Sequence, residues 1–234
     1  MRFSYLMMLA LAAVLALAGP AQATFVTYAD SVSFTSDLEA DKNIVLPSFD
    51  NMGGTRTLLD VIVEFGHSGK AEPAADNDDP FQGASVRARV IRQWSGSGPG
   101  VGTFGSNTVN SPFISLDPDD GDGGNNDVFD PTAPDGHDFG ILGYGPLTIG
   151  PFNPAEALYD TPAPNTVTFT ITPTLMVNDL QFQDPPGTPD AWQLEVENPL
   201  LTVEVSVTYE YIPEPATASL LSLGALLVLR RRRK

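Results

Sequence analysis

The sequence predicts an all-β fold: an antiparallel β-sandwich, jelly-roll-like or immunoglobulin-like, with a long Gly/Pro/Asp-rich loop insertion. Three observations lead to this prediction. Apolar and polar residues alternate with a period of two in several segments, 21 Pro and 21 Gly fall mostly between them, and only one helix start is convincing. Strands with one apolar and one polar face bury the apolar faces of two sheets against each other. The strand order stays open.

The alternation places the individual strands. It is clearest from Leu201 to Tyr211, where every second residue is apolar and the residues between are Thr, Ser or Glu. The one helix start, Asn153-Pro154 followed by Glu156, predicts a helix of one or two turns. Six strands are visible and as many as eight are expected; the six cover 25–34, 58–65, 85–94, 166–172, 192–197 and 201–211.

Residues 1–23 are typical of a secretory signal peptide, and the alternative is an uncleaved N-terminal anchor. Met1 and Arg2 give a positive start, Tyr5–Ala18 is an unbroken run of 14 residues without charge, and Gly19-Pro20 ends the helix. Ala21 and Ala23 provide the small side chains that signal peptidase requires, so the mature chain is predicted to start at Thr24.

The C-terminal segment 213–234 has three consecutive parts. Pro213-Glu214-Pro215 comes first, Ala216–Leu229 carries no charge, and Arg230–Lys234 is a run of five cations. As a helix, 216–229 would extend about 21 Å, short of a hydrocarbon core of about 30 Å, so it predicts a weak and temporary membrane anchor. The cations are expected to stay cytoplasmic, which leaves residues 24–212 outside.

These three parts in this order resemble the PEP-CTERM sorting signal of Gram-negative bacteria; the alternative is a simple tail anchor. The resemblance implies that an exosortase in the membrane binds Pro213, Glu214 and Pro215 and removes the tail. It also implies delivery of the protein to the outer surface or to the exopolysaccharide matrix.

The body, residues 24–212, is expected to form one domain. Leu46–Asp50, followed by Gly53 and Leu58–Val61, is similar to the opening of bacterial choice-of-anchor E domains, and Val205–Tyr211 is similar to their final strand. The loop-rich segment 95–165 departs from that pattern. Because this family has no assigned chemistry, the resemblance implies no catalytic residue.

The charge of the body excludes some partners. The chain has 29 acidic and 12 basic residues. Without Arg2, the five terminal cations and Glu214, the body keeps 28 acidic and 6 basic side chains. Such a field repels nucleic acid and anionic lipid and attracts divalent cations. The chain has no cysteine, so a hydrophobic core must stabilise the fold without disulfides.

An acidic segment inside 95–165 is the candidate metal site. Closely spaced Asp and Asn separated by Gly can wrap calcium, although an EF-hand register fails because Pro118 and Phe129 fall at ligand positions. The alternative is a solvated acidic loop. Asp76–Asp79 is a second, weaker acidic cluster; it is expected to be a surface turn, and the alternative is that it completes a site across the fold. The candidate calcium ligands are Asp117, Asp119, Asp120, Asp122, Asn125 and Asp127.

No catalysis is expected. His67 lies in Gly66–Lys70, which fails the Gly-x-Ser-x-Gly motif because Lys70 replaces the last glycine. His137 has no second histidine spaced to form a zinc site with it. Carboxylate-pair glycosidase chemistry stays open, since many acidic pairs are available.

We therefore expect a structural or adhesive protein of the cell surface or exopolysaccharide matrix. The alternative is a carbohydrate-binding module with calcium-supported loops, and a secreted glycoside-active enzyme is the remaining option. For the module, Trp94 and Tyr144 are the candidate surface aromatics, whereas Trp192 is expected in the core beside Leu194 and Val196.

Overall fold

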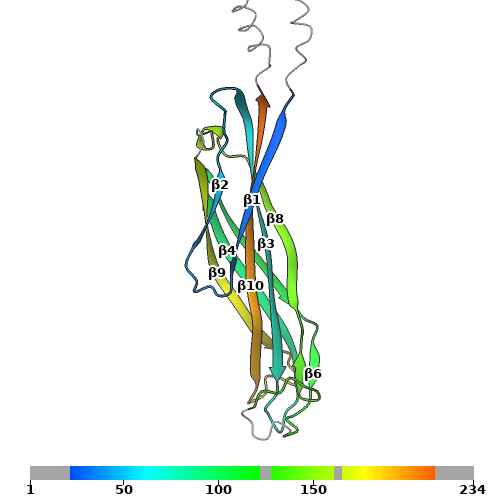
Figure 1. Ribbon diagram of the computed structural model, residues 1–234. Coiled ribbons are helices and arrows are strands. Elements are labelled where there is room, and N and C mark those ends of the chain that lie inside the picture. The colour runs from blue at the N-terminus through cyan, green and yellow to red at the C-terminus, as the bar shows by residue number, and fades with distance from the viewer. Residues whose placement is uncertain (1–21, 122–127, 161–164, 214–234) are drawn as a thin grey trace, which may run out of the picture.

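The computed structural model describes residues 22–121, 128–160 and 165–213, which form an almost purely β structure (Figure 1). Ala21, Glu214, Pro215 and the predicted anchor 216–229 lie outside these residues. Within them, no helix is long and apolar enough to span a bilayer. The elements, in chain order, are β1 (Thr24–Phe34), β2 (Lys42–Pro47), β3 (Arg56–Asp76), β4 (Ala84–Gly98), β5 (Val101–Asn110), β6 (Ile114–Leu116), β7 (Gly136–Asp138), β8 (Leu142–Phe152), the 3-10 helix η1 (Glu156–Leu158), β9 (Thr166–Phe182) and β10 (Gln193–Pro213).

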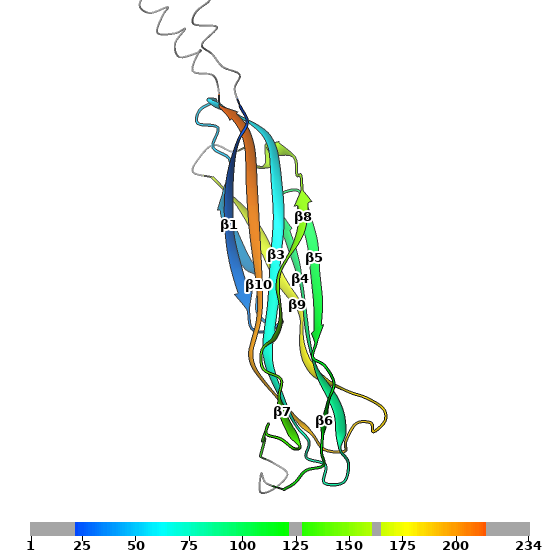
Figure 2. The same ribbon diagram turned by 90° about the vertical axis from the view of Figure 1, so that its right-hand side faces the viewer.

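Two antiparallel sheets face each other, which confirms the predicted β-sandwich. Sheet A has the order β1-β10-β3, and the outer edge of β3 pairs with β8 along 63–71 and with β7 along 74–76. Sheet B has the order β2-β9-β4, and the outer edge of β4 pairs with β6 along 84–86 and with β5 along 89–98. Figure 2 shows β1 along one long side of the molecule and β5 along the other.

The strand order is that of a jelly roll. Each of the first four strands pairs with a later one: β1 with β10, β2 with β9, β3 with β8, and β4 with β5. One long antiparallel hairpin, rolled up into two sheets, gives this order. An immunoglobulin sandwich has a different order: with its seven strands lettered A to G along the chain, one sheet has the order ABED and the other CFG. The structure therefore decides between the two predicted types.

The sandwich is long and narrow (Figures 1 and 2). Strands β3 and β10 have 21 residues each and run along its whole length, which is roughly 65 to 70 Å at about 3.3 Å per residue. Thr24 lies opposite Tyr211 at one end, and Asp76 lies opposite Gln193 at the other. We call the first end the base. The opposite end, with the described residues of loops 77–83, 117–135 and 183–192, is the tip.

The main core lies between the sheets from the base to the middle of the molecule. It is rich in aromatic rings: Phe65 packs against Trp94, Phe152 and Phe169 with ring centroids 5.7 to 6.1 Å apart. A smaller cluster near the tip has four buried residues, Ala75, Ala84, Val86 and Leu116, and four partly buried residues pack against it: Ile114, Phe139, Leu180 and Phe182. Apolar packing therefore weakens towards the tip.

A buried arginine joins the two sheets where the main core ends. Arg92 is fully buried, and its guanidinium donates five hydrogen bonds. Burial lowers its pKa to about 10, so the side chain keeps its charge at neutral pH. The acceptors are the carbonyl oxygens of Lys70, Ile91, Val177 and Leu200 and the Asn178 side-chain oxygen.

All six predicted strands are present, but several are longer than expected. The segments 192–197 and 201–211 belong mostly to one strand, β10, with an irregularity in its pairing between Glu197 and Leu200. The predicted helix is a single 3-10 turn, η1. The interpretation of 95–165 as loop-rich is wrong over β5 and β8. The residues of β5 are mostly small or polar, and Pro and Gly interrupt β8, so neither strand alternates visibly.

The two tryptophans are placed opposite to expectation. Trp94 is fully buried, because β4 continues to Gly98 and Trp94 shares the inward face of Val86, Ala88 and Val90. Trp192 is 40% exposed, since it precedes the first residue of β10 at the tip, where its ring packs on Phe182. Trp94 therefore cannot form a glycan platform.

Candidate functional site

The tip concentrates negative charge. Its described segments contain no Lys or Arg. Calcium and other hard divalent cations are the natural counterions for such a surface. The carboxylates of these segments and of the adjoining end of β3 belong to Asp76, Asp78, Asp79, Asp117, Asp119, Asp120, Asp130, Asp135, Asp184 and Asp190.

Asp79 holds the tip loops together. One carboxylate oxygen accepts the backbone N–H groups of Phe81 and Gln82 at 2.9 and 3.1 Å, and the other accepts that of Asp190 at 2.9 Å. Its backbone carbonyl accepts the N–H of Asp119 at 3.0 Å. These hydrogen bonds, led by the one from Asp190, lower the pKa of Asp79. One residue therefore links all three loops.

The prediction of a surface turn at 76–79 is wrong. Each of its four residues is less than 10% exposed. The side-chain amide of Asn77 donates to the carbonyl oxygens of Gln82 and Asp117 at 2.9 and 2.7 Å. Loops from distant parts of the chain cover this segment, so its burial depends on contacts with residues far away in sequence.

Asp76 carries an unfavourable negative charge. Burial raises its pKa, and the neighbouring charges of Asp78, Asp135 and Asp130 act in the same direction. The N–H of Asp130, which donates to Asp76 at 2.7 Å, opposes this shift only in part. A bound cation or a proton near Asp76 would relieve the repulsion.

The structure brings together part of the predicted calcium site. Asp119 and Asp120 meet Asp135, and one carboxylate oxygen from each lies within 4.8 Å of the others. Asp117 is exposed and does not belong to this group, while Asp122, Asn125 and Asp127 lie outside the described residues. An all-oxygen group of this kind fits calcium or magnesium better than zinc.

Asp135 belongs to this group although the sequence does not predict it as a ligand. It is 3% exposed, and its carboxylate accepts the N–H of Asp120 at 2.9 Å. Two backbone hydrogen bonds also hold Pro134 and Asp135 in place. The N–H of Asn77 donates to the Asp135 carbonyl, and the N–H of Asp117 donates to the Pro134 carbonyl. Fifteen residues separate Asp135 from Asp120, so local spacing carries no signal for their proximity.

The two histidines lie apart from this group. His67 is 4% exposed within β3, its Nδ1 lies 3.1 Å from the Tyr144 hydroxyl, and burial lowers its pKa. Burial also raises the pKa of the Tyr144 hydroxyl to about 12. Because the Tyr144 side chain is half-buried, its ring is not an exposed platform for a sugar. His137 lies in β7 and packs edge-on against Phe139. Because 66–70 lies inside continuous β3, the turn of a nucleophile elbow is absent there.

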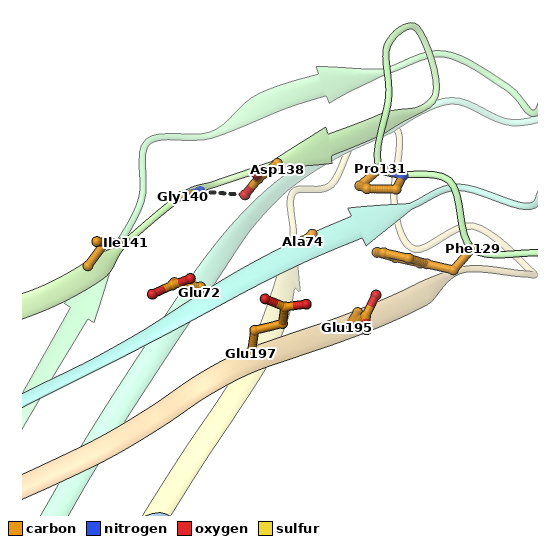
Figure 3. Close-up of a pocket in the computed structure, with 9 residues that line it drawn as sticks. All are labelled: Glu72, Ala74, Phe129, Pro131, Asp138, Gly140, Ile141, Glu195 and Glu197. Carbon is orange, nitrogen blue, oxygen red and sulfur yellow. Dashed lines mark hydrogen bonds between the residues drawn. The ribbon is translucent and has the colours of Figure 1, made fainter.

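A shallow groove opens on the outer face of sheet A beside the tip (Figure 3). Its volume is about 230 Å³. Glu197 lies directly opposite Glu72, an unfavourable pairing of like charges that the Asn198 side-chain amide, donating to Glu72 at 3.1 Å, moderates. The groove has acidic and apolar walls and can accept a cationic group. Its lining residues are Glu72, Ala74, Phe129, Pro131, Asp138, Gly140, Ile141, Glu195 and Glu197.

Neither a protein-family model nor a curated protein matches this sequence. One similar solved structure is the "Crystal structure of infectious bursal disease virus VP2 subviral particle", with 10% identity, a TM-score of 0.20, and 92% of this chain and 50% of that chain covered. Another is the "Structure of infectious bursal disease virus Gx strain", with 10% identity, a TM-score of 0.18, and coverage of 85% and 42%. This chain spans half or less of the length of those chains. Such low TM-scores carry no argument about function.

Proposed function

We propose that this chain is an exported structural or adhesive protein of the cell surface or exopolysaccharide matrix. Residues 1–23 direct its secretion, and signal peptidase removes them. Pro213, Glu214 and Pro215 direct sorting by an exosortase while 216–229 holds the chain in the membrane. The body is then presented outside the cell, and no catalysis is required of it.

The observation that carries this proposal is the position of the two chain ends at the base. Pro213, the first residue of the sorting motif, is the last residue of β10 and lies opposite Arg56. Thr24 starts β1 beside it (Figure 1). A chain held through its C-terminal segment therefore points its tip away from the point of attachment, roughly 65 to 70 Å distant.

A second candidate function is carbohydrate binding with calcium-supported loops. The group Asp119, Asp120 and Asp135 favours it, because calcium bound there would order the tip loops around a ligand. Trp94 is buried, and the Tyr144 hydroxyl is hydrogen-bonded to His67. The aromatic contacts of such a module must therefore come from other residues.

The test is to express the full chain, with an epitope tag after Thr24, in a Gram-negative host that has an exosortase. The wild type is expected on the outer surface with its mass reduced by loss of the tail. A variant with Pro213, Glu214 and Pro215 all changed to Ala should stay full-length in the inner membrane. Pro118→Ala, at an exposed proline of the tip, is the control. Normal sorting of the triple variant would overturn the proposal.

A further inference from the structure

The outer face of sheet B carries no charged side chain over its basal half. This surface, which we call the plateau, consists of every second residue of β2 from Asn43 to Pro47, of β9 from Thr166 to Thr172, of β4 from Gln93 to Ser97 and of β5 from Gly102 to Thr108. All of these residues are exposed or half-buried. Most are Thr, Ser, Asn or Gln.

The outer face of sheet A differs sharply over the same length. There Asp60 lies opposite Glu210, and Glu64 and Glu204 follow on the same face. The body as a whole has 28 acidic and 6 basic side chains. Absence of charge is therefore a particular property of the plateau and not of the sandwich surface in general.

The strand register arranges the polar groups of the plateau in rows. One row contains Asn43, Thr170, Ser97 and Gly102, and the next contains Thr172, Ser95 and Phe104. Neighbouring strands are about 4.8 Å apart, and successive outward residues are about 6.7 Å apart along a strand. Hydroxyl and amide groups thus repeat regularly in two directions.

Phe104 adds an exposed aromatic ring to this polar surface. It is 55% exposed and lies on the edge strand β5, opposite Ser95. Within the plateau, the other large exposed apolar side chain is that of Val45, 50% exposed on the opposite edge strand β2. A stable protein–protein interface needs a contiguous apolar centre, which two separated side chains do not provide. Hydroxyls and amides around one exposed ring suit a sugar chain, which has hydroxyls along its edges and C–H groups on its ring faces.

The charge distribution selects a neutral sugar chain over an acidic one. An uncharged ligand can approach the plateau without losing the hydration of ionic groups, while the acidic field of the rest of the body repels uronates. Two arginines share this outer face, but both lie on β4 between the plateau and the tip, and Arg89 pairs with Asp179.

We infer that the plateau of sheet B is a binding surface for a neutral polysaccharide. The inference rests on the proposed presentation of the protein outside the cell and identifies the partner there. Binding is expected to involve the Thr and Ser hydroxyls of β9 and β4 along the chain, with Phe104 stacked on one sugar ring.

The test uses the purified full chain on an array of neutral polysaccharides (glucans, galactans and mannans) and on uronate-containing alginate. Retention on a neutral member, with none on alginate, is expected. Phe104→Ala and Ser95→Arg should each weaken retention about tenfold. Ser206→Arg, the same substitution on the outer face of sheet A, should leave it unchanged. All three positions are at the surface, and circular dichroism verifies folding.

Three results would overturn the inference: no retention on any neutral polysaccharide, full retention by both plateau variants, or equal loss in Ser206→Arg. A concentration-dependent dimer in sedimentation that Ser95→Arg abolishes would assign the plateau to a second copy of the chain instead. Because binding is measured on purified protein, its failure is distinct from a failure of export or sorting.

Discussion

In the body of the sandwich the sheets meet through buried aromatic and β-branched side chains, whereas at the tip three loops are joined through aspartates that accept backbone N–H groups. Apolar packing needs no ionised carboxylate and no bound cation, so it changes little with pH or with calcium. Carboxylate hydrogen bonds depend on both. The difference indicates a base and middle that hold their shape and a tip whose stability responds to its surroundings.

The largest expected effect belongs to the packed body. In Gly105→Ala the new methyl group would overlap the indole nitrogen of Trp94, which is fully buried. We expect a loss of about 1 to 3 kcal/mol in the free energy of unfolding, measured by urea denaturation. Gly102→Ala, on the same strand with nothing within 4 Å of the added methyl, is the matched control and should change little. Equal effects of both would contradict the packing described for Trp94.

At the tip, Asp79→Asn should lower the melting temperature at neutral pH, because the charged acceptor of three backbone N–H groups is lost. Because the pKa of Asp79 is lowered in the folded protein, its carboxylate stabilises the fold fully when the pH is above the pKa of an unfolded aspartate. This stabilisation is lost as the pH falls through the pKa of Asp79 in the folded protein. The difference between variant and wild type should therefore close in acid. A difference that persists below both pKa values would show that the charge is unimportant.

Calcium should stabilise the tip by a smaller amount. With the dissociation constants of about 0.1 to 1 mM that extracellular calcium modules show, about 1 mM calcium adds roughly 0.4 to 1.4 kcal/mol. Differential scanning fluorimetry of the full chain should show a higher melting temperature that EDTA reverses and that Asp135→Asn reduces. An unchanged melting temperature in the wild type would leave Asp119, Asp120 and Asp135 as a structural group.

The smallest effect is a gain. Asp76→Asn removes a charge whose pKa is raised, and its side-chain oxygen can still accept the Asp130 N–H. Ionised Asp76 destabilises the fold when the pH is above its pKa in the folded protein. When the pH is below the pKa of an unfolded aspartate, Asp76 is protonated in both states and has no such effect. We expect the melting temperature of Asp76→Asn to be slightly higher than that of the wild type at neutral pH and equal to it in acid. Asp184→Asn, at an exposed carboxylate of the tip, should show no such gain.

The body was more predictable from the sequence than the tip. Six strands follow from their alternation, because burial of one face imposes a period of two on residues such as Leu201 to Tyr211. The strand β5 escaped prediction because its inward positions include Gly105 and Asn107 in place of large apolar residues. Trp94 is buried where a surface position is predicted, because β4 continues to Gly98 and Trp94 lies on the same inward face as Val90.

The tip escaped prediction for a different reason. Asp79 and Asp135 are buried by loops that the jelly-roll order brings together from three distant parts of the chain. An acidic segment predicts exposure when it is considered alone. Only the pairing of β3 with β7 and of β4 with β6 places these loops at the same end.

Presentation of the tip on the outside of the cell is the central claim, and cysteine labelling tests it most directly. The chain has no native cysteine, so Thr188→Cys at the tip and Thr55→Cys at the base each introduce a single reactive thiol at an exposed position. On intact cells a membrane-impermeant maleimide should label Thr188→Cys, and a bulky maleimide polymer should label it faster than Thr55→Cys. Labelling of Thr188→Cys only after the cells are lysed would contradict the account.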